Sequence, residues 1–137
     1  MKYLLDTNVI SELVKLRPNE KVLSWVSEKD SSILFISVIT LGEIRKGVTG
    51  ITDPKKYEKI SHYLETELPD YFEERILPIN REVADEWGKL QGKLKSNPLP
   101  AIDALLAVTA KVYNLKLVTR NTKDFVNAFV DLVNPWE

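Results

Sequence analysis

The chain begins with Met1-Lys2-Tyr3-Leu4-Leu5-Asp6-Thr7-Asn8, a short apolar run that stops at an aspartate. Apolar runs of this length between polar residues are typical of buried strands, so residues 2–5 predict a strand. Residues 9–14 then have helical spacing, with Thr7 or Asn8 as the expected N-cap. A strand that passes directly into a helix indicates an α/β fold.

The same alternation continues along the chain. Further apolar runs predict strands over residues 33–36, 75–79, 115–118 and 130–133. The strand at 75–79 is expected at an edge of the sheet, because Pro78 cannot donate a hydrogen bond to a ladder. Helical spacing predicts helices over residues 20–28, 38–46, 54–68, 81–94 and 102–113. We therefore expect residues 1–137 to form one α/β domain, with a mainly parallel sheet of four to five strands flanked by helices.

Composition narrows the chemistry that this chain can perform. Among 137 residues there is no cysteine and only one histidine, which excludes disulfides, thiolate metal sites and cysteine nucleophiles. No apolar stretch approaches the roughly 20 residues needed to span a bilayer, so we expect a cytoplasmic protein without membrane contact. The net charge of −1 means that a nucleic-acid partner would need a local basic patch.

Carboxylates occupy the positions where a parallel α/β fold binds its ligands. Asp6 follows the first predicted strand, and Asp124 lies in the segment that follows the strand at 115–118. Both are expected at the carboxyl edge of the sheet, where such folds bind ligands. Glu43 lies in the helix after the second strand, and Asp103 begins a helix that is apolar nearly all round. Four carboxylates close together would repel one another, and a hard divalent cation relieves that repulsion.

Four blocks of the chain resemble PIN-domain proteins in both sequence and order. Together with Asn134-Pro135-Trp136, they resemble the FitB-like branch of the VapC toxins. The resemblance covers essentially the whole chain and therefore implies a three-layer PIN-like fold. The blocks are Leu5 to Leu13, Ile39 to Ile44, Asp103 to Ala107 and Thr119 to Phe125.

The resemblance also implies an activity and a set of site residues. It implies a metal-dependent endoribonuclease in which Mg²⁺ or Mn²⁺ is held by acidic residues. The matching positions here, expected to be both metal ligands and catalytic residues, are Asp6, Glu43, Asp103 and Asp124. The matching polar positions that would support them are Thr7, Thr119 and Asn121.

Partners follow from the same resemblance. It implies an RNA substrate, a cognate antitoxin protein of a type II toxin–antitoxin pair, a homodimer, and DNA contacts made only through the antitoxin. From the residues themselves, Arg45 and Arg120 are the best candidates to bind substrate phosphates around an acidic centre. Apolar residues such as Trp25, Tyr57 and Tyr63 are candidates for a dimer contact or an antitoxin groove.

Two alternatives remain open at the level of sequence. One is a phosphatase of the haloacid-dehalogenase type with Asp6 as nucleophile, although the second aspartate of that pattern is replaced here by Asn8. The other is a catalytically silent PIN-like module whose acidic pocket receives a basic side chain of a partner. Phosphorylation of Asp6 would favour the first alternative, and partner binding without RNA cleavage would favour the second.

Overall fold

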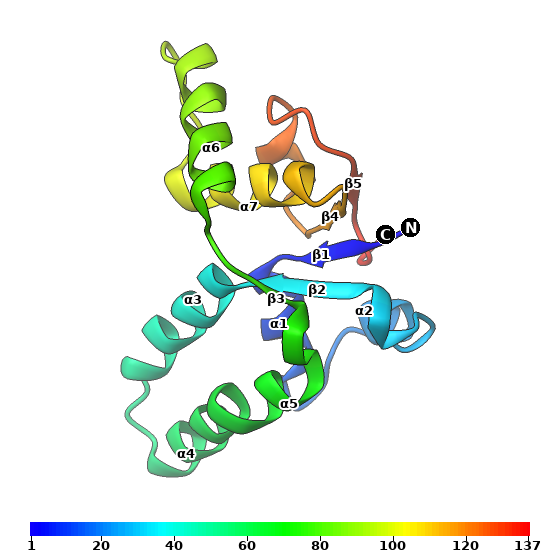
Figure 1. Cartoon of the computed structure of the whole chain (residues 1–137). Coiled ribbons are helices and arrows are strands. Elements are labelled where there is room, and N and C mark those ends of the chain that lie inside the picture. The colour runs from blue at the N-terminus through cyan, green and yellow to red at the C-terminus, as the bar shows by residue number, and fades with distance from the viewer.

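A five-stranded sheet forms the centre of the molecule in a computed structural model that describes all residues from 1 to 137 (Figure 1). The strand order is β3-β2-β1-β4-β5, and every neighbouring pair is parallel. The predicted parallel α/β sheet is therefore confirmed, and β3 lies at an edge of the sheet, as predicted from Pro78. The strands are β1 (Tyr3–Leu5), β2 (Leu34–Ser37), β3 (Ile76–Leu77), β4 (Lys116–Val118) and β5 (Leu132–Val133).

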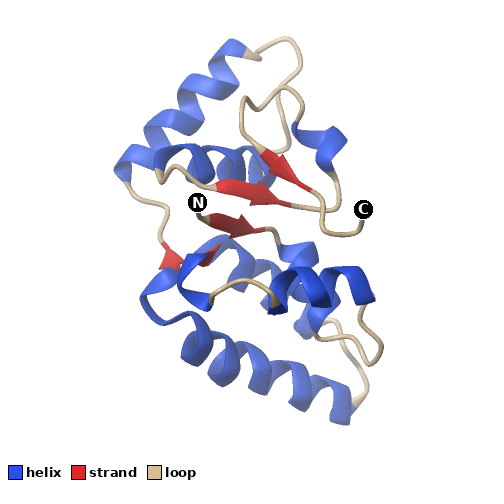
Figure 2. Ribbon diagram, turned by 90° about the vertical axis from the view of Figure 1, so that its right-hand side faces the viewer, coloured by secondary structure: helices blue, strands red, loops and turns tan.

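Helices cover both faces of this sheet. α6 and α7 lie on one face, and α1, α3, α4 and α5 lie on the other (Figure 1). Figure 2 shows the strands between these two helical layers. No helix is both long enough and apolar enough to cross a bilayer. The helices are α1 (Thr7–Leu13), α2 (Glu20–Ser27), α3 (Val38–Thr49), α4 (Pro54–His62), α5 (Leu68–Phe72), α6 (Arg81–Lys93) and α7 (Ala101–Val112).

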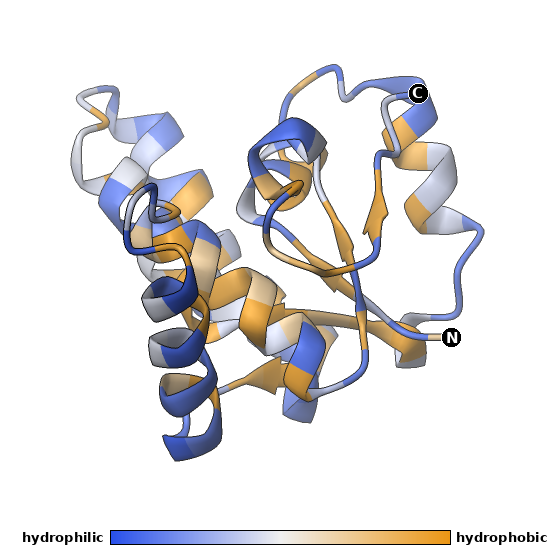
Figure 3. Cartoon of the chain, turned by 90° about the horizontal axis from the view of Figure 1, so that it is seen from above, coloured by the Kyte–Doolittle hydropathy of each residue, from blue (hydrophilic) through white to orange (hydrophobic).

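The core consists of layers on opposite faces of the strands. Successive strand residues point to opposite faces, so Leu4 packs with Leu117 in the cluster under α7. Leu5 packs with Val118 in the other cluster, which also contains Val9 of α1. In Figure 3 the strands are mostly orange, at the hydrophobic end of the scale. Burial on both faces explains why the strands are continuous apolar runs in the sequence.

Two details differ from the sequence predictions. Asp6, not Thr7 or Asn8, is the N-cap of α1; its backbone is extended and its side chain accepts from the Thr7 backbone N–H. The helix that begins at Pro54 does not end before Pro69. It continues through a π-helical turn (Tyr63–Glu67) into α5, where Pro69 lies in the first turn. The Leu68 backbone N–H still donates to the Tyr63 carbonyl oxygen of the π-helical turn, so the helix is hydrogen-bonded up to the residue before Pro69.

Candidate functional site

The ends of β1 and β4 bring two distant parts of the chain together. Leu5 is in register with Val118, and the Asp6 backbone N–H donates to the Val118 carbonyl oxygen at 2.9 Å. Asp6 and Thr119 therefore leave neighbouring parallel strands at the same level. This is the carboxyl edge of the sheet, where the sequence predicts a ligand site.

Asp6 is held by three neutral hydrogen-bond donors. Its Oδ1 accepts from the Thr7 backbone N–H at 2.6 Å, and its Oδ2 accepts from Thr119 Oγ1 at 2.8 Å. Asn8 Nδ2 lies 3.4 Å from the same Oδ2. Neutral donors fix the carboxylate without cancelling its charge, as an arginine or lysine would. Asp6 therefore remains available as an anionic ligand.

Burial makes this charge costly. Only 8% of Asp6 is exposed, and this burial is the largest cause of the rise of its pKa from 3.8 to about 6. The hydrogen bonds from Thr119 and Thr7 oppose the rise, whereas the negative charges of Glu43 and Asp103 add to it. A cation bound nearby would therefore stabilise the charged form of Asp6.

Thr119 links the loop after β4 to helix α1. Its hydroxyl oxygen accepts from Asn8 Nδ2 at 3.2 Å and from the Asn121 backbone N–H at 3.1 Å. The Arg120 backbone N–H lies 3.4 Å from Asn8 Oδ1. Thr119 is fully buried, so these bonds hold the loop in one position relative to Asp6.

Glu43 reaches the site from helix α3, where its side chain contacts Thr7. Thr7 Oγ1 donates to Glu43 Oε1 at 2.6 Å, and Thr40 Oγ1 lies 3.1 Å from Thr7 Oγ1. Thr7 therefore contacts both carboxylates, through its backbone N–H to Asp6 and through its hydroxyl to Glu43. This arrangement explains why a threonine suits the position after Asp6.

Asp103 and Asp124 complete the acidic set at different depths. Asp103 lies in the first turn of α7, where burial and then the charges of Asp124 and Glu43 raise its pKa. Asp124 is exposed on a 3-10 turn (Thr122–Phe125), close enough for its charge to act on Asp103. The four predicted carboxylates are therefore electrostatically connected.

Three of these carboxylates line one cavity of about 410 Å³. Asp124 is not among its lining residues, and all but one of the residues that line it are polar or charged. The cavity is lined by Asp6, Thr7, Asn8, Ser11, Glu12, Lys15, Glu43, Asp103, Arg120, Asn121 and Trp136.

The donor set of this cavity fits a hard divalent cation. No three Asp, Glu or His side chains stand close enough together to form a complete metal cage. Mg²⁺ does not require one, because it commonly keeps several waters and binds through one or two carboxylates. The carboxylates that line the cavity offer oxygen ligands, and the pKa of Asp6 is raised first by burial and then by the charges of Glu43 and Asp103, so a bound cation would stabilise its charged form.

The two predicted arginines differ in position. Arg120 lines the cavity, and its guanidinium lies 5.5 Å from the centre of the Trp136 ring. Arg45 does not line it. Arg45 Nη2 instead lies 2.7 Å from Glu65 Oε1, and both side chains are exposed.

One face of α1 belongs to the cavity and was not assigned to the site from sequence. Asn8, Ser11 and Glu12 lie on one face of α1, and Lys15 follows shortly after the helix ends at Leu13. Glu12 is 6% exposed and accepts from Lys15 Nζ and the Asn19 backbone N–H, both at 2.9 Å. The hydrogen bond from Lys15 is the main reason that the pKa of Glu12 is lowered.

The parallel sheet and its acidic cavity define a PIN-like α/β protein, the class that the sequence resembles. Comparison with known proteins agrees, since the PIN domain family matches residues 3–128. Toxin FitB of Neisseria gonorrhoeae is 36% identical, over 97% of both chains. VapC ribonuclease Y4jK of Sinorhizobium fredii is 33% identical, over 97% of this chain and 96% of the relative.

The solved structures that resemble this chain include proteins of the same family. The crystal structure of FitAcB from Neisseria gonorrhoeae matches with a TM-score of 0.90 and 36% identity, over 98% of this chain and 99% of that chain. The structure of FitAB bound to an IR36 DNA fragment also gives a TM-score of 0.90, with 34% identity over 98% and 96% of the two chains. The chain therefore belongs to the PIN-domain family, in the branch that contains the FitB and VapC toxins.

Proposed function

We propose that this chain is a metal-dependent endoribonuclease and the toxin of a type II toxin–antitoxin pair. The observation that carries the proposal is the cavity at the carboxyl edge of the sheet, which Asp6, Glu43 and Asp103 line together. Two relatives that match nearly the whole chain are named a toxin and a VapC ribonuclease, which supports the same conclusion.

Mg²⁺ or Mn²⁺ is the cofactor that these side chains suit best. One or two of Asp6, Glu43 and Asp103 would bind the ion directly and the rest through its waters, and Asp124 would add its charge from outside the cavity lining. When bound, such an ion supplies charge neutralisation at a phosphate and lowers the pKa of a bound water.

The protein's own residues position the carboxylates and bind the RNA phosphate. Thr119 and Thr7 fix the two oxygens of Asp6, and the Thr7 hydroxyl fixes Glu43. Asn121 holds Thr119 through its backbone N–H and lines the cavity. Arg120 lies at the rim, where a guanidinium binds the non-bridging oxygens of an RNA phosphate. The site thus combines an acidic centre with a basic rim.

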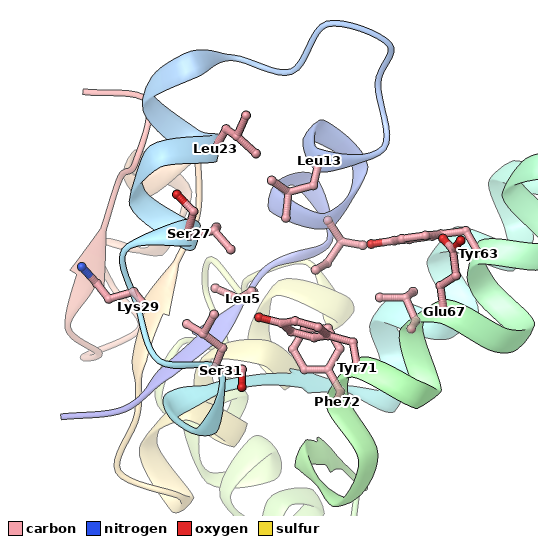
Figure 4. A pocket seen from close by; sticks show the side chains of 14 residues that line it. Leu5, Leu13, Leu23, Ser27, Lys29, Ser31, Tyr63, Glu67, Tyr71 and Phe72 are labelled. Carbon is pink, nitrogen blue, oxygen red and sulfur yellow. The ribbon is translucent and has the colours of Figure 1, made fainter.

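An apolar pocket on the other side of α1 is the surface that we assign to the antitoxin. This pocket of about 430 Å³ lies between α1, α2, the π-helical turn and α5, and ten of its fourteen lining residues are hydrophobic. Leu13 and Leu23 point into it from one side, and Tyr63 and Tyr71 point into it from the other (Figure 4). An apolar groove of this kind suits the nonpolar face of a partner helix.

One of the solved relatives, FitAB, is bound to a DNA fragment. We propose that any DNA contact of the present chain is made through its antitoxin. A homodimer stays a prediction of the sequence resemblance.

The phosphatase alternative requires a second acidic residue that this chain lacks. The side chain at its expected position is Asn8, whose amide donates toward Asp6 and Thr119 and whose carbonyl oxygen faces the Arg120 N–H. An amide cannot act as a general acid or base in the manner of a carboxyl group. No feature of the structure favours the silent module over the nuclease, so it is an outcome of the test.

The test is cleavage of total cellular RNA by the purified, partner-free protein. We expect discrete fragments with Mg²⁺ or Mn²⁺, no fragments with EDTA, and none from the Asp6→Asn variant. Asp131→Asn is the matched control, because Asp131 is exposed and lies outside the cavity. A folded protein that releases no fragments with either metal would refute the nuclease and favour the binding module.

A further inference from the structure

Two further cavities adjoin the cavity that the carboxylates line. A second cavity of about 570 Å³, between the end of α1 and α4, shares Ser11 and Lys15 with it. A third, of about 290 Å³, shares Glu43 with the first, Lys56 and Ile60 with the second, and Ser11 with both. The three cavities therefore adjoin one another, from Asp6 past Ser11 and Lys15 to α4.

Positive charge gathers in the second of these cavities. The second cavity is lined by nine residues, of which four are lysines and one is an aspartate. Its lysines are Lys15, Lys55, Lys56 and Lys59. In a chain with a net charge of −1, this is a local concentration of charge of the kind that a nucleic-acid partner requires.

The lysines of α4 are not engaged elsewhere. The ion pairs of the structure involve none of Lys55, Lys56 and Lys59. The one aspartate in the cavity, Asp53, is the N-cap of α4 and accepts from the Lys55 backbone N–H at 3.0 Å. Lys59 lies four residues after Lys55 and three after Lys56, so it shares a side of α4 with both of them.

We propose that Lys55, Lys56 and Lys59 form a phosphate-binding track for the RNA strand that enters or leaves the carboxylate cavity. The proposal rests on the proposed nuclease function and extends it to a surface outside the active site. Arg120 lies at the cavity, Lys15 lies where the two cavities meet, and the three α4 lysines continue beyond it. These basic groups can bind an RNA backbone next to an acidic centre that would otherwise repel it.

An RNA strand fits this surface better than the protein partner does. The second cavity, which the track residues line, has only three hydrophobic lining residues, whereas the apolar pocket has ten and lies on the other side of α1. Unpaired ammonium groups interact with phosphates as point charges and need no shape complementarity. The two surfaces therefore suit two different partners.

Binding of single-stranded RNA in EDTA tests the track without cleavage. The variant is Lys55→Gln/Lys56→Gln/Lys59→Gln, which should keep its fold because α4 contains no buried residue. If each lysine makes one phosphate contact, the slope of log Kd against log salt falls by about 2, at about 0.7 for each contact to a single strand. Since this contribution vanishes near about 1 M salt, Kd at about 0.15 M salt rises roughly fiftyfold.

The matched control is Lys93→Gln/Lys95→Gln/Lys111→Gln, which removes the same charge from residues outside all three cavities. We expect its Kd and salt slope to remain those of the wild type. With Mg²⁺, the α4 variant should cleave a dinucleotide at the wild-type rate but show a raised KM for long RNA.

Three results would overturn the track. One is an α4 variant with the salt slope of the wild type, and another is a control variant that loses the same affinity. The third is an α4 variant that binds RNA normally but loses its antitoxin, which would assign the surface to the protein partner. If the wild type cleaves RNA and the α4 variant binds RNA as tightly as the wild type does, the track is refuted and the nuclease proposal stands. A wild type that neither binds nor cleaves RNA would refute the nuclease and the track together.

Discussion

Replacing Asp6 by Asn should stabilise the metal-free protein at neutral pH. Burial raises the pKa of Asp6 from 3.8 to about 6. The charged form is therefore disfavoured in the folded state, and at pH 7.5 its cost is about 3 kcal/mol, at 1.36 kcal/mol per pKa unit. Asn has nearly the same shape and no charge, so the variant should recover up to about that amount of unfolding free energy.

The sign of the pH dependence follows from linkage. A carboxyl group whose pKa is raised on folding destabilises the native state above the folded pKa, and this cost disappears as pH falls toward the unfolded value of 3.8. The advantage of Asp6→Asn should therefore shrink to about 1 kcal/mol at about pH 4.5. Taking the difference between the two proteins cancels the titration of all other groups.

Urea denaturation of both proteins in EDTA, at pH 7.5 and at pH 4.5, measures this difference. The wild type should also gain about 2.7 kcal/mol from Mg²⁺ at a hundred times its Kd, and Asp6→Asn should gain far less. A variant that is less stable than the wild type at pH 7.5, or a difference that does not change with pH, would show that the buried charge is not costly.

Three further substitutions test the surroundings of the site. Thr119→Val removes the hydroxyl donor to Asp6 and should raise the pKa of Asp6 further, which a shift of the pH–cleavage profile to higher pH would report. Thr7→Val removes the hydrogen bond to Glu43 and should lower Mg²⁺ affinity or cleavage roughly 10- to 100-fold, whereas Thr7→Ser should retain both. Equal losses in Thr7→Val and Thr7→Ser would contradict the role of the hydroxyl. Leu23→Asp places a charge at the apolar pocket and should abolish antitoxin co-purification with RNA cleavage unchanged, and retained co-purification would place the antitoxin elsewhere.

Sequence predicted the sheet well because its strands are buried on both faces. Each appears as an apolar run, so each predicted segment overlaps an observed strand. The start of α1 was predicted less well, since an aspartate after a strand reads equally as a turn residue or a cap. The helix across Pro69 was missed because proline usually marks a break, and a π-helical turn has no sequence signature of its own.

The candidate site was predictable to the extent that it depends on strand ends. The end of β1 and the register with β4 determine where Asp6 and Thr119 lie. Trp136 could not be placed from sequence, because its position over Arg120 depends on how the C-terminal segment packs. The pairing of Arg45 with Glu65 is likewise a contact between residues distant in sequence, and no local pattern predicts it.

The π-helical turn has a consequence for the two surfaces on either side of it. A π-helical turn contains one residue more than an α-helical turn, so it shifts the phase of all residues beyond it by about 100°. The helical segment from Pro54 to Phe72 can therefore present its lysines in one direction and Tyr71 in another. Deleting Thr66 would remove the extra residue and rotate α5 relative to α4. A single inserted residue thus sets the angle between the lysines of α4 and Tyr71 of α5, and with it the angle between the two surfaces proposed above.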